Sequence, residues 1–404
     1  MEAYLLDWAN LLLRWLHVIV AIAWIGSSFY FVFLDNNLLK PTDPELQKKG
    51  VDGAMWAVHG GGFYHPQKYL VSPPKIDSEL HWFYWESYST WLSGFALFSV
   101  LYLWNADTFL VDKNLHDWSP MAAGFTAVGF LVAFWFIYDG ICRWAGVGPK
   151  ARAGDGVIGA LVLLVLAVAC WGACQLFPGR AAFLLIGAML ASTMTANVAH
   201  WIIPGQRTVV ADMQAGKTPD PIYGQRGKQR SVHNTYFTLP VLFAMLSNHY
   251  GFLYSSAYNW VILLAMMLSG AAIRQFFVQR HGWRHGRAPH PWPWAAGGVV
   301  VLLAVIVGVK AVQPAAPVSV APSAPPSFAQ VQAVLNQRCL TCHGPQVQMK
   351  SLRFDDPATV LANAQNIHQQ VAVLRLMPMN NATGITDAER ALIGAWVKAG
   401  AKTD

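Results

Sequence analysis

The sequence has little charge and little cysteine. Only 12% of its 404 residues are Asp, Glu, Lys or Arg, whereas soluble domains contain about 25%. Most of the chain is therefore expected to lie outside water. Of the five cysteines, Cys339 and Cys342 share one motif, and the other three lie in or beside apolar segments. Ordinary buried packing accounts for those three.

Signals for several protein classes are also missing. The sequence contains no convincing Rossmann glycine pattern, P-loop or nucleic-acid signature, and the glycines at 60–62 lack the strand–helix context that such a loop needs. The net charge of +7 comes from short loops between apolar runs, so nucleic acid is not expected as a partner. No cleavable signal peptide is expected, because the first apolar run is long enough to span a membrane and no small-residue cleavage site follows it.

Long apolar runs dominate what is present. Hydrophobic residues make up 54% of the chain, and its 18 Trp suit the interfaces of a membrane. Spanning a bilayer takes roughly 20 apolar residues. Eight runs approach this length: 11–34, 81–104, 121–145, 156–177, 181–204, 236–254, 257–279 and 293–312. The pattern predicts an all-α fold, a bundle of about eight transmembrane helices over residues 1–312, in which the sixth run is the weakest.

The loops between these runs differ in charge. The first, third, fifth and seventh loops contain 16 Lys and Arg, whereas the even-numbered loops contain only Lys113 and Arg180. Because positive residues collect in cytoplasmic loops, the N-terminus and the C-terminus are both predicted outside. We expect a multi-pass protein of the bacterial inner membrane, with its C-terminal segment in the periplasm.

A haem-attachment motif lies in that segment. "RCLTCHG" (338–344) contains C-x-x-C-H, in which Cys339 and Cys342 bind the haem covalently and His343 binds its iron. A zinc or redox site of the C-x-x-C type would need a second ligand pair, which is absent. One haem c is therefore predicted, and its periplasmic attachment agrees with the charge asymmetry.

The motif belongs to a small predicted domain, 328–404, which follows a proline-rich spacer at 313–327. "FAQVQAVLNQR" predicts its first helix, and "TDAERALIGAWVKAG" predicts its last helix with a capping box from Thr386 to Glu389. The domain resembles a class I cytochrome c. In that resemblance Met377, in Met-Pro-Met-Asn, is the sixth iron ligand, and Met379 is the alternative. Met/His ligation raises the haem potential, which suits an electron acceptor.

Two histidines lie near the outer face of the predicted bundle. His17 is in the first run, and His249 follows the sixth run. The Leu-His and Trp pattern around His17 resembles the histidine-bearing helix of membrane oxidases that contain haem b. His17 and His249 are candidate ligands of a haem b iron, and a structural, hydrogen-bonded histidine is the alternative for each.

A larger polar group is predicted near the cytoplasmic face. Ionisable residues inside spanning segments usually face the bundle interior for a reason. The Arg side chains taken singly could instead extend to the interface. As a group, however, these residues predict a pocket for a polar, planar anion. They are His65, His81, Glu86, Asp139, Arg143, Asn197, His200, Arg207, His233, Asn234 and Arg274.

Several segments together resemble the bacterial membrane-bound urate hydroxylase family, a cytochrome c-fused urate oxidase. They are "HGGGFYHPQKYLVSPP", "LHWFYWESYSTWLSGFALF", "IIPGQRTVVADMQAGKTPDP", "QRSVHNTYFTLPVLFAMLSNHY" and the C-terminal haem domain. The resemblance covers essentially the whole chain. It implies oxidation of urate with water to 5-hydroxyisourate, with electrons leaving through the haem instead of forming hydrogen peroxide.

Within this resemblance the polar residues receive roles. His81, Glu86 and His233 are the candidate catalytic bases. The candidate substrate-binding residues are Asn234, Arg274, Arg207 and His65. The partners expected are urate, the lipid bilayer and a periplasmic electron acceptor such as a soluble cytochrome c or a terminal oxidase. The alternatives are a membrane-anchored cytochrome c electron-transfer subunit, a different haem-linked dehydrogenase and a transporter with a redox tail.

Overall fold

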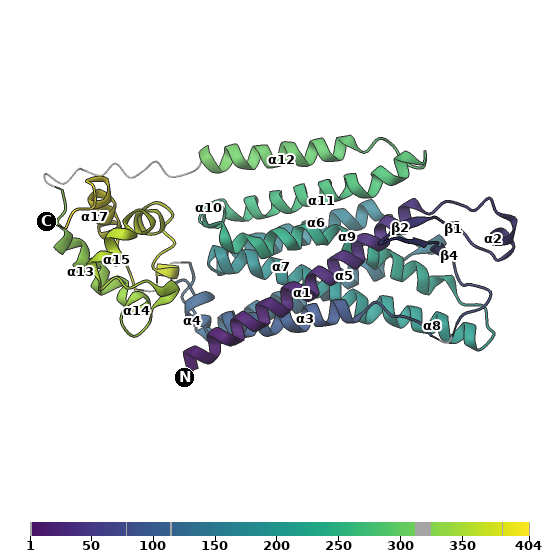
Figure 1. The fold of residues 1–404 in the computed structure, drawn as a ribbon, viewed down its shortest axis with the longest axis horizontal. Helices are drawn as coiled ribbons and strands as arrows, with labels where there is room; N and C mark the ends of the chain where they lie inside the picture. Colours follow the sequence, from purple (N-terminus) through teal and green to yellow (C-terminus); the bar gives the residue numbers. More distant parts are fainter. Residues whose placement is uncertain (1, 78, 114, 312–324, 382, 404) are drawn as a thin grey trace.

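The structure is a computed structural model that describes residues 2–311 and 325–403, apart from positions 78, 114 and 382. The described chain is almost entirely helical and forms a long bundle and a smaller C-terminal group of helices (Figure 1). The all-α architecture agrees with the predicted fold class. The predicted spacer at 313–327 lies outside the described residues except for its last three positions.

Six helices of the described chain are long and apolar enough to cross a membrane. They coincide with six of the eight predicted spans and are α1 (Glu2–Asn37), α5 (Pro120–Ala145), α6 (Asp155–Leu176), α7 (Gly179–Asn197), α11 (Asn259–Arg284) and α12 (Trp292–Ala311). Helix α7 continues through the π-helical turn η3 (Val198–Ile202) into α8 (Ile203–Gln214), well past the predicted end at 204. By length and composition, the chain is a membrane-spanning protein.

The other two predicted spans are helices inside the bundle that are less apolar or shorter. They are α3 (Trp85–Phe98), extended by η1 (Ser99–Leu103), and α9 (Pro221–Leu246). Helix α3 packs along α1, and α9 packs along α7. Helix α9 begins 15 residues before the predicted 236, because Asp220 caps its first turn and Pro221 occupies the first helical position. Its first half therefore brings polar residues from the predicted loop into the bundle.

The bundle has two distinct ends (Figure 1). The start of α1 and the C-terminal helices lie at one end, which we call the proximal end. The other, distal end holds α8 and the loop after α1, which contains α2 (Pro44–Lys48) and four short strands: β1 (Gly53–Ala54), β2 (Ala57–His59), β3 (Gly62–Tyr64) and β4 (Gln67–Lys68). Strands β1 and β4 pair antiparallel, as do β2 and β3. Gly60 and Gly61 have positive φ and form the β2–β3 turn, which explains these glycines by backbone geometry.

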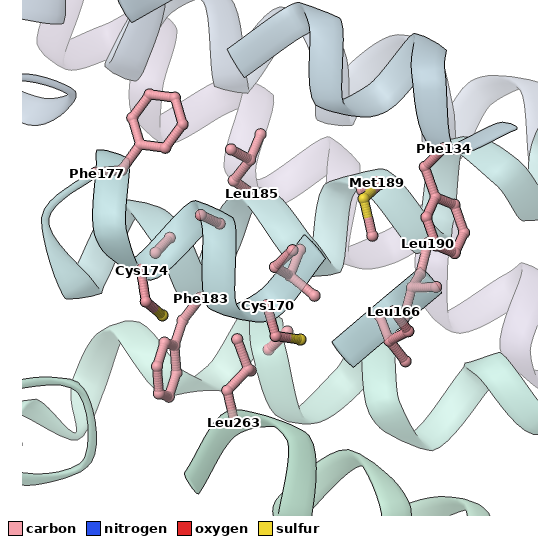
Figure 2. Packing of buried hydrophobic residues seen from close by; sticks show 14 of the residues in the cluster. Phe134, Leu166, Cys170, Cys174, Phe177, Phe183, Leu185, Met189, Leu190 and Leu263 are labelled. Atoms are coloured by element: carbon pink, nitrogen blue, oxygen red, sulfur yellow. The ribbon is translucent and has the colours of Figure 1, made fainter. Parts of the chain in front are cut away.

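Small and apolar residues hold the bundle together. Gly187 on α7 allows Ala244 on α9 to approach closely, because a Cβ on the glycine would lie 2.7 Å from the Ala244 Cβ. Figure 2 shows the adjacent core, in which the thiols of Cys170 and Cys174 pack among Phe and Leu side chains. Many large apolar side chains are exposed on the outside of the bundle, as expected for helices that face lipid.

The C-terminal helices have a separate apolar core, formed by residues such as Val331, Leu335, Ile393 and Trp396. The helices and turns are α13 (Phe328–Arg338), α14 (Leu340–His343), η5 (Met349–Ser351), α15 (Pro357–Ala362), α16 (Ala364–Ile367), η6 (His368–Val373), η7 (Met379–Asn381) and α17 (Asp387–Lys398). The Thr386–Glu389 capping box is present as predicted. This group contacts the proximal end, where η7 lies against α4 (Ala106–Phe109). The bundle continues there with η4 (Ser247–His249) and α10 (Gly251–Tyr254).

Candidate functional site

The haem-attachment motif lies at the junction of α13 and α14 and opens onto a cavity. Cys339 and Cys342 are both free thiols. They line one cavity together with His343, Met377 and Met379. Two thiols, one imidazole and a thioether around a single space are the donors that a covalently attached haem with Met/His ligation requires. The residues present therefore fit the predicted haem c.

Burial sets the protonation of the motif. It raises the pKa of the Cys339 thiol to about 12 and also raises the pKa of Cys342. Burial lowers the pKa of His343, which keeps its imidazole neutral at pH 7, the form that binds iron. No group of three or more His, Cys, Asp and Glu side chains that could hold a metal ion occurs among the residues the structure describes. A haem iron needs only two protein ligands, one on each face.

The cavity beside the motif has a volume of about 2270 Å³, larger than the roughly 300–1,000 Å³ of most ligand sites. It extends from the C-terminal helices across the proximal end and into the bundle. Its walls inside the bundle include His17, Trp91, Thr195 and Thr238. A single space therefore connects the haem-attachment motif with the interior of the membrane-spanning part.

Both histidines predicted to bind haem b line this cavity, at different depths. His17 lies in the bundle interior, and its Nδ1 is 3.1 Å from both the Thr90 carbonyl oxygen and the Ser93 hydroxyl oxygen. Gly94 leaves room for this ring, since a Cβ there would lie 2.8 Å from its Cε1. His249 is exposed at the proximal end in η4.

A buried polar network lies one helical turn beyond the inner end of the cavity. Asn197 of α7 donates through Nδ2 to the Tyr138 hydroxyl and to Asn234 Oδ1, each at 3.0 Å. The Tyr138 hydroxyl lies 2.7 Å from His233 Nδ1. Asn234 donates to the carbonyl oxygen of Met194, which itself lines the cavity. The structure thus brings together two of the predicted site residues, His233 and Asn234.

A buried ion pair adjoins this network on the distal side. The Asp139 carboxylate accepts hydrogen bonds from Arg230 Nη2 at 2.7 Å, Trp201 Nε1 at 2.7 Å and Arg143 Nε at 2.6 Å. Arg230 is nearly fully buried, and its guanidinium lies 5.0 Å from the ring centres of both Tyr138 and Trp201. Two guanidinium groups thus share one carboxylate, which leaves an excess of positive charge beside the network.

Arg274 of α11 is also buried, but it is not part of this network. Its guanidinium carbon lies 4.0 Å from the centre of the Phe29 ring of α1. Its Nε and Nη2 are buried and have no hydrogen-bond partner among the described residues. Burying a charged group without a hydrogen-bond partner lowers the stability of a protein. We therefore expect these two donors of Arg274 to bind a ligand or water.

The remaining predicted site residues lie at the distal rim and do not join the network. His81 is exposed, with its ring edge-on to Phe83 at 4.5 Å. Glu86 is in the first turn of α3 and half-buried. Arg207 is exposed on α8, 5.8 Å from the centre of the Tyr84 ring.

His65, in the loop after α1, is also at the distal end. Its ring stacks on Trp56 with centroids 4.3 Å apart and an angle of 10° between the planes. This stacking occupies one face of the imidazole and gives it a structural partner. Its assigned role in substrate binding stays a prediction.

Sequence reasoning did not single out three residues of the network region, Tyr138, Trp201 and Arg230. Arg230 was assigned to a cytoplasmic loop, because α9 was expected to begin at 236. Its position three and four residues before His233 and Asn234 places all three on one face of a helix. The Asp220-Pro221 capping signal could have extended that helix and moved Arg230 into the bundle.

Fold and site together define a membrane-spanning helical protein that has an internal polar site and a cavity, and the cavity extends from a C-x-x-C-H motif to within one helical turn of that site. The chain belongs to the family described as Urate oxidase N-terminal, whose profile matches residues 3–310. This family indicates an oxidoreductase that acts on urate, and the recognition made from the sequence is confirmed for the membrane part. Residues 311–404 lie outside the match. Neither a curated protein nor a solved structure matches the chain.

Proposed function

We propose that the protein is a membrane-bound urate hydroxylase. Urate and water together give 5-hydroxyisourate, two protons and two electrons, and the oxygen of the water becomes bonded to C5 of urate. The electrons go to the C-terminal domain and not to oxygen, so no hydrogen peroxide forms. Two observations support this proposal. The membrane part belongs to the Urate oxidase N-terminal family, and the C-terminal part contains the C-x-x-C-H motif.

The cavity is the observation that supports this coupling most directly. Its walls include both motif cysteines, Cys339 and Cys342, and its inner end reaches Met194, whose carbonyl oxygen binds Asn234 of the polar network. A mere membrane anchor for an electron-transfer domain would need neither an interior cavity nor a buried polar network. The arrangement suits an enzyme that oxidises its substrate inside the bundle.

We assign the general base to His233 among the three predicted candidates. It is the one that lies in the buried network, where its Nδ1 faces the Tyr138 hydroxyl at 2.7 Å. A positioned imidazole can accept a proton from water or from a ring N–H of urate. The exposed His81 and the half-buried Glu86 lie at the distal rim, where bulk water competes for such a proton.

His343 and Met377 would hold the haem c iron, and Cys339 and Cys342 its vinyl carbons; when bound, this group accepts electrons one at a time at a raised potential. Arg390 supports the methionine loop, donating through Nη1 to the Met377 carbonyl oxygen at 2.8 Å. Burial lowers the pKa of Arg390 to about 10, which still leaves it charged at pH 7. A buried positive charge at this place favours the reduced form of a neighbouring redox group.

We infer an intermediate electron carrier from the length of the bundle between the network and the proximal end. Asn197 lies 18 residues along α7 from Gly179 at the proximal end, roughly 27 Å at 1.5 Å per residue. Electron tunnelling decays exponentially with distance, so one step over this span is too slow for turnover. His17 packs against Gly94, which lies roughly 14 Å from the proximal end of η1 by the same rise.

His17 fits the role of a haem b ligand. Histidines that bind metals usually have their other ring nitrogen held by a carbonyl or a carboxylate, and the Thr90 carbonyl oxygen lies 3.1 Å from His17 Nδ1. The Nε2 atom would then be available to iron. His249 lies at a different depth of the cavity, so its assignment as the second ligand stays a prediction from the sequence. Purified protein should show one b-type and one c-type haem per chain; a single haem with no b-type absorbance would remove this carrier.

The proposed function also includes a location and an orientation in the membrane. We place it in the bacterial inner membrane with the proximal end and the C-terminal domain on the periplasmic side, as the loop charges predict. The two electrons then leave to a periplasmic acceptor, such as a soluble cytochrome c or a terminal oxidase. Urate reaches the network either from the distal, cytoplasmic side or through the cavity.

Anaerobic addition of urate to the purified full chain tests the function. We expect the c-type haem to become reduced, with two electrons recovered per urate and with oxygen from labelled water in the product. A chemical reductant added afterwards provides the control, since it shows how much haem is reducible. Absence of any spectral change with urate, in protein that the reductant does reduce, would rule the function out.

A further inference from the structure

Two buried polar atoms beside Tyr138 have no partner among the residues the structure describes. One is Asn197 Oδ1, an acceptor on a residue with no exposed surface. The other is Arg230 Nη1, a donor on a residue that is 2% exposed. A buried polar atom that stays unsatisfied lowers stability, so two such atoms beside one ring indicate a ligand that satisfies them.

Asn197 Nδ2 and Arg230 Nη2 are both engaged, which fixes the orientation of the two side chains. Both donor contacts of Asn197 Nδ2 are made, to Tyr138 and Asn234. Its amide oxygen therefore cannot exchange places with the nitrogen without losing the bond to Asn234 Oδ1, which can only accept. Arg230 is held by Asp139 through Nη2 and lies 5.0 Å from the centre of the Tyr138 ring. The free acceptor and the free donor thus adjoin the same tyrosine in a preset arrangement.

A ligand that satisfies both atoms must present one donor and one acceptor. The lactam edges of an oxidised purine do this, because a ring N–H stands next to a carbonyl group. The positive charge of Arg230 and Arg143, opposed by the single carboxylate of Asp139, favours an anion. The neighbouring imidazole of His233 places a candidate base within reach of such a ring.

We propose that Asn197 and Arg230 form the recognition site for a lactam edge of urate. The ring N–H donates to Asn197 Oδ1, and the adjacent carbonyl oxygen accepts from Arg230 Nη1. This inference rests on the proposed function and adds to it the two residues that select the substrate. The sequence placed Asn197 in the predicted pocket without a role of its own and did not place Arg230 there.

The test uses wild-type full chain and the four N-monomethyl urates, each compared with urate as a competitive ligand and as an anaerobic haem reductant. A methyl group on the recognised nitrogen removes the donor and meets the Asn197 oxygen. We expect the urates methylated at that edge to bind about tenfold or more weakly than urate, and the others to bind as urate does. Equal binding of all four would overturn the proposal.

The variant Asn197→Ala then tests whether Asn197 causes the weaker binding of the methyl urates. It removes the acceptor and makes room for a methyl group, so the excluded methyl urate should bind as well as urate does. Arg230→Lys keeps the charge but replaces the planar donor, and should raise the KM for urate more than it lowers kcat. Arg226→Gln is the matched control; this exposed guanidinium also lies near Trp201, at 5.8 Å from the ring centre, and its loss should leave the methyl-urate pattern unchanged.

The outcomes distinguish failure of the recognition site from failure of the proposed urate oxidation. An unchanged exclusion pattern in Asn197→Ala overturns the recognition site while urate oxidation stands. A wild-type protein that urate fails to reduce, although a chemical reductant does, removes the function and this site with it. Should Asn197→Ala not fold, the wild-type methyl series and Arg230→Lys still decide the question.

Discussion

The bundle and the C-terminal helices distribute their polar and apolar side chains in opposite ways. The bundle exposes apolar side chains such as Leu164 and Phe125 to its surroundings and keeps Asp139, Asn197 and Arg230 inside. The C-terminal part keeps Trp396 and similar side chains inside and places most of its charge on the surface. Lipid offers a polar group no hydrogen-bond partner, whereas water does. Polar side chains therefore lie inside the bundle but on the surface of the C-terminal part.

A polar residue is informative about function where neither water nor a paired side chain accounts for it. On the surface of the C-terminal part, a charge such as Asp355 needs no explanation beyond solubility. Inside either region, a buried charge must be paired or used. Asp139 and Arg230 are paired in the bundle, whereas Arg390 in the C-terminal part binds carbonyl oxygens of the predicted ligand loop. Buried polar atoms without a partner, such as Asn197 Oδ1, are the strongest indications of a ligand.

The largest effect is expected when the connection between the two regions is removed. Cys339→Ser combined with Cys342→Ser should abolish covalent haem and reduce urate-driven respiration of membranes to background, because electrons can no longer leave the bundle. Haem staining on a denaturing gel and oxygen uptake measure the two changes. Cys174→Ala, in the bundle core, is the control that should retain both. A double variant that consumes urate at the wild-type rate would contradict the coupling.

Burial of a carboxylate should determine the second effect. Asp139 and Asp35 each bind two cationic side chains, but Asp139 is 6% exposed and Asp35 36%. Asp139→Ala leaves Arg230 charged and buried, and should lower the free energy of unfolding by about 3–5 kcal/mol. Asp35→Ala should lower it by about 0–1 kcal/mol. Thermal unfolding in detergent compares the two, and equal losses would show that the Arg230 ion pair is not buried as described.

The third effect concerns Arg390, the buried cation of the C-terminal part. Arg390→Met removes the hydrogen bonds to the carbonyl oxygens of Val371 and Met377 and should destabilise the ligand loop by about 1–3 kcal/mol. It should also lower the haem midpoint potential, because a buried positive charge is lost. Arg390→Lys keeps the charge and should restore the potential more than the stability. Identical potentials in wild type and Arg390→Met would contradict the electrostatic role.

The smallest effect is a pH dependence confined to the capping box. A hydrogen bond from the Thr386 backbone lowers the pKa of Glu389, with further help from Arg338. The folded state therefore prefers the carboxylate, and its contribution to stability is present above the ordinary Glu pKa and is lost as the pH falls through the lowered value. Glu389→Gln should reduce the difference in stability between neutral and acidic pH, measured by haem absorbance of the full chain. An unchanged difference would contradict the role of the capping box.

Features that depend on neighbours in the chain were predictable. The haem-attachment motif is defined by a spacing of a few residues, and the Thr386–Glu389 capping box by a spacing of three. The helices α13 and α17 lie where the sequence places them, within a few residues. The Asp139–Arg143 pair was also predictable, since residues four apart on a helix face each other.

Features that depend on packing were only partly predictable. A helix that is apolar nearly all round, such as α6, gives no periodic signal for the face that turns inward. The sequence indicated that His233 and Asn234 belong to an inner polar group. It did not indicate that Tyr138 completes the group, or that His81 and Arg207 lie at the distal rim.

The sequence alone determined a helical membrane protein with a C-x-x-C-H motif near its C-terminus, because hydropathy and motif spacing are properties of contiguous residues. Only the tertiary structure decided that a single cavity joins that motif to the bundle interior. It also decided that Asn197 and Arg230 leave an acceptor and a donor free beside Tyr138. Those arrangements arise from the contacts among α5, α7 and α9, which are far apart in the chain and are positioned by close packing at small residues such as Gly187.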